Sequence, residues 1–172
     1  RIITRPSNLA TNSVISLVDA RRVTRTLRAL GARSMTVLRG VEDGKAYQKG
    51  LNNTATARDL ATLLAAIERG KAASARSTQA MRAILLAQEL NDEIPAGLPP
   101  GTPVAHKTGQ ITGVLHDAAI VYPPGRAPYV LVVLTSGIPD EKVATALIVD
   151  ISRSVYAHAA RGAPPAGSTP RP

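Results

Sequence analysis

The sequence contains no cysteine, no phenylalanine and no tryptophan, and its aromatic residues are four tyrosines. The absence of cysteine excludes a disulfide framework and a thiolate nucleophile, and it leaves the redox compartment open. Without the larger aromatic side chains, the core must be built from Ala, Leu, Val and Ile. No apolar run approaches the ~20 residues of a membrane-spanning helix, so we expect no membrane span. A length of 172 residues suits one domain with its own core.

Positive charge exceeds negative charge, with 21 Lys and Arg against 12 Asp and Glu. An excess of this kind is typical of nucleic-acid binding where the basic residues cluster. The densest cluster lies in one predicted helix and comprises Arg21, Arg22, Arg25, Arg28 and Arg33. No aromatic residues accompany it to stack on bases. We interpret it as a solvated helix face and expect no specific nucleic-acid partner.

Residues 1–102 are predicted to form the helical part of the domain. Apolar spacing and capping residues indicate helices over 7–18, 19–31, 56–70 and 77–90, the last capped by Ser77. Residues 39–55 lack periodicity and contain three glycines, so we predict a surface loop there. A stretch rich in Pro and Gly after residue 94 ends the helical part.

Residues 103–161 are predicted to form an antiparallel sheet and a final helix of the same domain. Strand patterns cover about 104–108, 114–122 and 129–135. Asp140 is placed to cap a helix with an apolar stripe that could cover the sheet, formed by Val143, Leu147, Ile151 and Val155. The fold class is therefore α+β, and residues 162–172 are expected to be a disordered tail.

Residues 106–113 read His-Lys-Thr-Gly-Gln-Ile-Thr-Gly, and they lie between two apolar strand-like segments. Lys107 supplies a fixed cation and Thr108 a hydroxyl, while Gly109 lets a ligand or a backbone approach closely. Together these residues could hold a carboxylate. The alternative is an ordinary strand end, because a match of three residues also arises by chance.

Residues 6–12 read Pro-Ser-Asn-Leu-Ala-Thr-Asn, and Lys-Thr-Gly follows about a hundred residues later. This order and spacing resemble the class A β-lactamases and the related penicillin-binding serine hydrolases. In that family a Ser-Asp-Asn element and a Lys-Thr-Gly strand form opposite walls of the site, and the nucleophile lies on a Ser-x-x-Lys helix between them. The resemblance covers about residues 2–160. It implies a β-lactamase/transpeptidase-like fold and a periplasmic or secreted location.

The resemblance also implies roles for single residues. Asn8 matches the Asn that contacts the substrate's acylamide, and Asn12 matches a structural Asn one turn later. Lys107 and Thr108 match the residues that bind the substrate carboxylate. The backbone N–H of Gln110 falls where the family has one of two oxyanion donors. The alternatives are a plain helix cap for Asn8 and an exposed strand residue for Gln110.

Glu42 is our candidate for the base that activates the deacylating water in this family. The family's Glu-x-x-x-Asn pattern is absent, because Ala46 stands four residues after Glu42. Asp43 is therefore a rival, and both acids could simply be solvated loop residues.

Two departures affect the chemistry. Pro6 stands where the family has the serine of Ser-Asp-Asn, and none of the five lysines has a serine three residues before it. We therefore expect a serine hydrolase that acts on a β-lactam or related acyl-amide through an acyl-enzyme, with its nucleophile on an N-terminal segment missing from this sequence. This chain alone would then be inactive. A penicillin-binding peptidase or esterase, or a non-catalytic ligand-binding descendant, are the alternatives.

His106 and His116 suggest a triad or a metal site, because Asp117 follows the second histidine directly. Adjacent strand residues point to opposite faces, so only one of His106 and Lys107 can face a cleft. Metal-binding spacings such as His-Glu-x-x-His are absent. We interpret both histidines as structural and predict no metal and no cofactor.

Overall fold

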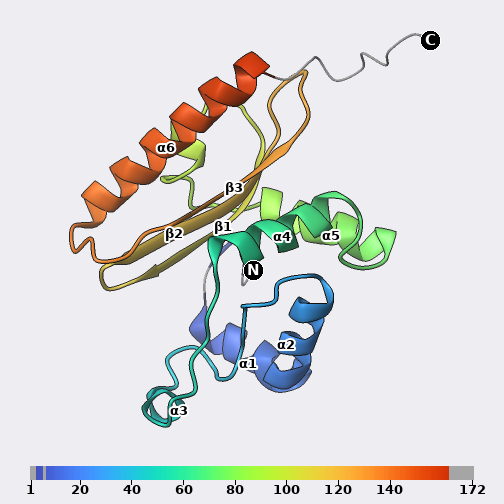
Figure 1. Cartoon of the computed structure of the whole chain (residues 1–172), viewed down its shortest axis with the longest axis vertical. Helices are drawn as coiled ribbons and strands as arrows, with labels where there is room; N and C mark the ends of the chain where they lie inside the picture. The colour runs from blue at the N-terminus through green and yellow to red at the C-terminus, as the bar shows by residue number, and fades with distance from the viewer. Residues whose placement is uncertain (1–2, 6, 163–172) are drawn as a thin grey trace.

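The computed structural model describes residues 3–5 and 7–162 (Figure 1). In chain order the elements are α1 (Asn8–Val18), α2 (Ala20–Ala29), α3 (Gly44–Gln48), α4 (Ala57–Glu68), α5 (Ala75–Leu86), the short 3-10 helix η1 (Pro95–Gly97), β1 (Val104–Ile111), β2 (Val114–Val121), β3 (Tyr129–Leu134) and α6 (Glu141–Gly162). The expected α+β order, with helices before an antiparallel sheet and a final helix, is confirmed. Pro6 and the predicted tail from 163 onward lie outside the described residues.

The sheet is antiparallel with the order β1-β2-β3. A two-residue turn of Thr112 and Gly113 joins β1 to β2 and pairs Ile111 with Val114. Gly113 has a φ of +70°, the left-handed conformation that such tight hairpin turns require. This closure extends β1 to Ile111, past its predicted end at residue 108, because the last residues of β1 pair with β2.

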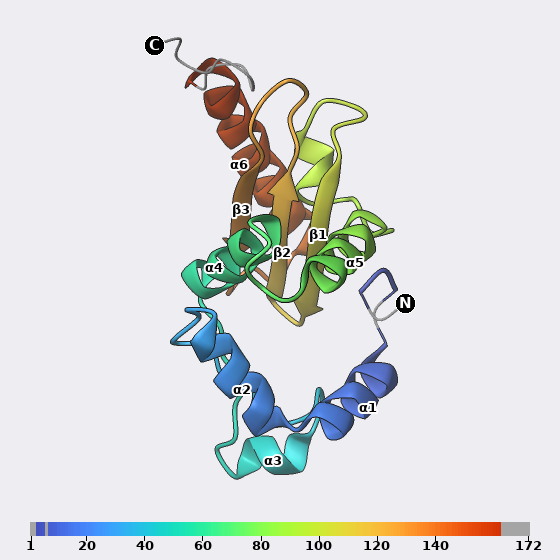
Figure 2. The same ribbon diagram turned by 90° about the vertical axis from the view of Figure 1, so that its right-hand side faces the viewer.

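Helices cover both faces of the sheet (Figures 1 and 2). α6 and η1 pack on one face, and α4 and α5 pack on the other. Side chains of the central strand β2 alternate between the two cores: Ala119 and Val121 belong to the α6 side, while Ala118 and Ile120 belong to the α4 and α5 side. The small Ala side chains in β2 let both helical layers approach closely.

The predicted apolar stripe of α6 is wrong for Val143 and Leu147, whereas Ile151 packs against the core as predicted. Val143 is 55% exposed and Leu147 is 43% exposed, whereas Ala144, Ile148 and Ser152 are buried. Both sets repeat every four residues, so periodicity does not distinguish them. Contacts with the sheet side and with η1 select the second set, because Ala144 and Ile148 belong to the core cluster and Ser152 packs on Gly97.

η1 and α6 approach each other closely at Gly97. A Cβ atom at Gly97 would lie 2.4 Å from the carbonyl oxygen of Val149 and 2.7 Å from Cβ of Ser152. Ser152 Oγ donates a hydrogen bond to the carbonyl of Ile94 at 2.8 Å. Only glycine fits this contact, and the buried hydroxyl is satisfied by the segment that it packs on.

α1, α2 and α3 lie together at one end of the molecule, apart from the two layers (Figure 2). The hydroxyl of Thr24 in α2 donates to the carbonyl of Val37 and accepts from its N–H, both at 3.0 Å. α1 has no buried residue, and Leu9 and Leu17 are more than 80% exposed. The apolar positions that predict this helix therefore have few neighbours among the described residues.

Three of the predicted helix starts carry a side-chain cap. Ser7 caps α1, Asp19 caps α2 and Thr56 caps α4, each by accepting a backbone N–H. The prediction of Ser77 as a cap is wrong, because Ser74 caps α5 and accepts the N–H of Ser77 at 3.3 Å. The predicted loop also contains a short helix, α3. No helix among the described residues is long and apolar enough to cross a membrane.

Candidate active site

Lys107 lies near the middle of β1 and is half-buried. Its Nζ donates to the carbonyl of Thr108. Burial lowers the pKa of Lys107, and the carboxylates of Asp117 and Glu93 partly oppose this shift. Its ammonium therefore lies in a poorly solvated place that favours contact with an anion.

Lys107 and Thr108 present their side chains to opposite faces of the sheet. Lys107 shares its face with Ala105, which belongs to the core beneath α4 and α5. Thr108 is 8% exposed and stands opposite Asp117 of β2. The structure thus brings the lysine ammonium against the backbone of Thr108, while the threonine hydroxyl lies on the α6 side.

The N–H of Gln110 points away from β2. Closing a two-residue turn makes Ile111 and Val114 a hydrogen-bonded pair, and such pairs alternate along an antiparallel ladder. At the other end of the ladder the N–H of Tyr122 donates to the carbonyl of Pro103 at 3.0 Å. Both ends therefore agree that the odd-numbered residues of β1 form the hydrogen-bonded pairs. Gln110 falls on a pair that is not hydrogen-bonded, so its N–H projects from the outer edge of β1.

Gly109 lies between these groups on the outer strand. A Cβ atom there would meet only His116 Cβ at 3.8 Å, which is an ordinary contact. Crowding among the described residues therefore does not require glycine at this position. A missing side chain here leaves space beside Lys107.

Asn8 is the first residue of α1, and its side chain is exposed. Capping does not account for it, because Ser7 accepts the N–H of Ala10. Among the described residues, no hydrogen bond or ion pair joins Asn8 to Lys107 or to Thr108. The residues of the two predicted walls are therefore not joined by a direct contact of this kind.

The chain that enters α1 is attached to the end of α5. Gln88 Nε2 donates to the carbonyl of Ile3 at 2.7 Å, and Arg5 forms an ion pair with Glu89 at 2.7 Å. The ion pair is exposed and contributes little stability, whereas the buried Gln88 side chain is the firmer attachment. These contacts hold the beginning of α1 on the same side of the molecule as β1 and α5 (Figure 2).

Asn12 connects α1 to the loop that carries the candidate acids. Its Oδ1 accepts the N–H of Val41 at 2.6 Å, and its Nδ2 donates to the carbonyl of Val41 at 2.9 Å. A Cβ atom at Gly40 would lie 2.9 Å from Asn12 Oδ1, so glycine permits this approach. One side chain therefore fixes the loop backbone immediately before Glu42.

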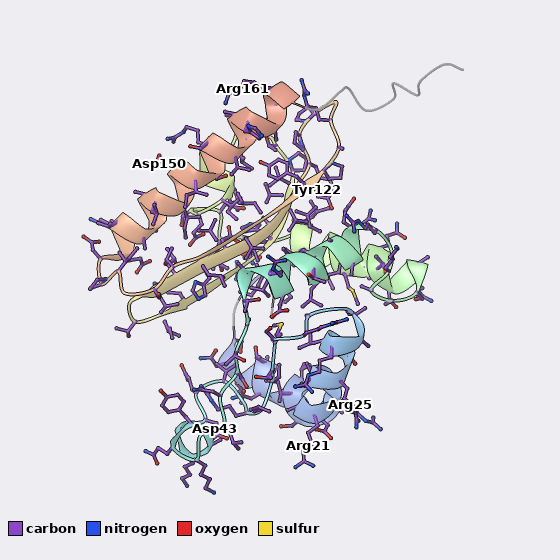
Figure 3. All side chains as sticks on the ribbon, viewed as in Figure 1. Arg21, Arg25, Asp43, Tyr122, Asp150 and Arg161 are labelled. Atoms are coloured by element: carbon purple, nitrogen blue, oxygen red, sulfur yellow. The ribbon has the colours of Figure 1, made fainter. Side chains whose placement is uncertain are left out.

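Glu42 and Asp43 differ in what their carboxylates do. Asp43 caps α3 by accepting the N–H of Ala46 at 3.0 Å, and it lies beside α3, away from the sheet (Figure 3). Glu42 has a φ of +61°, and its carbonyl accepts the N–H of Gly44 at 2.9 Å. Its carboxylate is exposed and makes no hydrogen bond to another described residue. The cap therefore holds the Asp43 carboxylate against α3, whereas the exposed Glu42 carboxylate has no such restraint.

A buried polar network behind β1 escaped the sequence analysis. His106 Nδ1 lies 3.1 and 3.2 Å from the two carboxylate oxygens of Asp117, and the N–H of Ile94 donates to Asp117 at 3.1 Å. The two-residue turn at 112–113 could have indicated this pairing. Its register places Thr108 opposite Asp117, so His106, two residues before Thr108, lies diagonally next to Asp117 on the same face of the sheet. In the described part of the chain, no group of three or more His, Asp or Glu side chains is arranged to hold a metal.

A search with family profiles matches residues 2–159 to the β-lactamase enzyme family. A β-lactamase of Streptomyces albus G is 33% identical over 138 residues, which cover 78% of this chain and 44% of that protein. A solved β-lactamase from Sphaerobacter thermophilus is 31% identical with a TM-score of 0.84, and the match covers 92% of this chain and 60% of that one.

A variant of PBP-A, solved as an acyl-enzyme complex with penicillin G, is 32% identical with a TM-score of 0.82. That match covers 91% of this chain and 58% of the PBP-A chain. The chain spans about half the length of the curated relatives that it matches.

Proposed function

Because this chain belongs to the β-lactamase enzyme family, in its class A branch, we propose that it forms part of a serine hydrolase active site. The reaction would open a β-lactam or a related acyl-amide through an acyl-enzyme. Residues 1–102 and 103–161 would be two parts of one domain, and the protein would act in the periplasm or outside the cell.

The edge of β1 is the observation that carries this proposal. The ammonium of Lys107 lies in a poorly solvated place on this strand, and the N–H of Gln110 projects from its outer edge. A cation there suits the substrate carboxylate, with the backbone of Thr108 and Gly109 beside it, while the Thr108 hydroxyl would take part only if its side chain turned from the α6 side. A backbone N–H three residues further suits the oxyanion of a tetrahedral intermediate, where one donor contributes about 3 to 4 kcal/mol.

Asn8 would contact the acylamide of the substrate from the opposite wall. Its exposed amide, free of any capping role, supports this assignment. Asn12 would act indirectly, by holding the loop that precedes Glu42.

Glu42 is the better candidate of the two loop acids for the deacylating base. Its carboxylate is exposed, whereas that of Asp43 is engaged as the cap of α3. A base must be able to move its carboxylate onto a water, and the Asp43 carboxylate is held against α3 by its cap, which favours Glu42.

The nucleophilic serine would come from polypeptide outside these 172 residues. No Ser-x-x-Lys occurs in the sequence, and the curated relatives are about twice as long as the part matched here. The exposed apolar residues of α1 and the outer edge of β3 support a further segment that docks on them. A hollow of about 730 Å³ lies beside that edge, between α4 and Tyr129. The 172-residue chain alone would then be inactive.

Nitrocefin hydrolysis by the full-length protein tests the reaction. We expect turnover, with Glu42→Gln slowing release of the acyl group and Asp43→Asn leaving it nearly unchanged. Turnover that Glu42→Gln does not alter removes Glu42 as the base. If nitrocefin does not acylate the full-length protein at all, the proposed serine hydrolase function is wrong.

A penicillin-binding peptidase or esterase is the second candidate. Ala46 in place of the family's Asn favours it, as does the likeness to PBP-A. Such a protein would form the acyl-enzyme but release it slowly, so the acyl adduct would accumulate.

A further inference from the structure

His106 is a fully buried histidine placed between two hydrogen-bond acceptors. One ring nitrogen, Nδ1, lies within 3.2 Å of both carboxylate oxygens of Asp117. The other, Nε2, lies 3.2 Å from Oδ1 of Asn91. Both His106 and Asp117 have no exposed surface.

The amide of Asn91 is oriented by a second hydrogen bond. Its Nδ2 donates to the carbonyl of Glu89 at 3.2 Å, so Oδ1 is the atom that faces His106. A flipped amide would place two oxygens against each other at Glu89. An amide oxygen and an ionised carboxylate only accept hydrogen bonds, so a ring that carries a proton on both nitrogens satisfies both contacts.

The charges around this pair decide whether His106 or Lys107 balances the negative charge of Asp117. Asp117 also accepts the N–H of Ile94, which is a donor without net charge. The acids Glu93 and Asp92 lie on the adjoining segment, and Lys107 is the other cation near Asp117. With a neutral His106, the charge of Asp117 would be balanced mainly by Lys107. With a charged His106, Asp117 has its own partner on the α6 side of the sheet.

We propose that His106 is a buried imidazolium paired with Asp117, and that it acts as a positioning residue that leaves the charge of Lys107 for a substrate carboxylate. The second half of this statement rests on the proposed function. The first half does not, so the two are tested separately.

The charge is tested by ¹⁵N NMR of the imidazole rings in the full-length protein at pH 7. Both nitrogens of His106 should show imidazolium shifts, and in Asp117→Asn the ring should change to a neutral tautomer. A neutral ring in the unaltered protein, or an imidazolium that persists in Asp117→Asn, overturns the ion pair.

The positioning role is tested by acylation rates of the full-length protein with penicillin G and with its methyl ester. His106→Gln should reduce the preference for the free acid by about tenfold, a change expected for weakening one charge contact. His116→Gln is the matched control and should leave the preference unchanged. An equal loss for acid and ester overturns the role, as does no loss. If the unaltered protein is not acylated, the proposed function fails, while the NMR result still decides the ion pair.

Discussion

Replacing Asn12 by Ala should release the loop at residues 39–43 from α1. The change removes two hydrogen bonds to Val41, at 2.6 and 2.9 Å, and leaves both backbone groups of a half-buried residue without that partner. Each bond contributes about 1 kcal/mol net, so the loss is about 2 kcal/mol. That corresponds to roughly a 30-fold larger equilibrium constant for local opening.

Hydrogen exchange of the Val41 amide in the full-length protein measures this opening directly. Asn12→Ala should lower protection at Val41 by about that factor, while amides of α6 keep theirs. Asn12→Asp retains the acceptor but sets an oxygen against the carbonyl of Val41, so protection should fall there as well. Asn8→Ala, at an exposed position of the same helix, is the control. Unchanged protection in Asn12→Ala, or an equal fall throughout the protein, would refute the reasoning.

Three further substitutions test other parts of the structure. Burial raises the pKa of Glu93, and the negative charges of Asp117 and Asp92 raise it further. The protonated side chain is therefore favoured in the folded state, and the stability that it contributes at low pH is lost as the pH rises through the raised pKa. Glu93→Gln should therefore raise Tm at pH 7 and should not raise it at pH 4, as thermal unfolding at the two pH values measures. Gly97→Ala should cost about 2 kcal/mol or more in chemical denaturation, because its Cβ would clash with α6, while Gly44→Ala has open space and should cost little. Tyr122→Phe should cost about 1 kcal/mol in the same assay, since the hydroxyl donates to Glu68 at 2.7 Å.

Local signals predicted most of the fold. Ser7, Asp19 and Thr56 cap helices by bonding within two or three residues, so nearby sequence contains the necessary information. The buried face of α6 was misassigned in part, because one of its contacts is with Gly97, which lies more than forty residues earlier. Two adjacent stripes of equal period cannot be separated without that contact.

In the candidate site, too, some features could be predicted from local sequence and others depend on distant contacts. Lys107 and Gln110 are identified by a short motif, and the turn at residues 112–113 determines how they face. The contact of His106 with Asp117 depends on strand register. Its contact with Asn91 depends on the segment between α5 and η1, whose sequence has no periodicity from which its position could be predicted. Alternation along one strand therefore indicated a structural histidine but not its partners.

The central claim is that this chain supplies walls of an active site whose serine lies elsewhere. Peptide mapping by mass spectrometry after brief exposure of the full-length protein to penicillin G tests it most directly. The account predicts one acyl adduct, on a serine outside the 172 residues, and none on the 172-residue chain treated alone. An adduct on a serine within these residues would contradict it, and so would a full-length protein that is never acylated.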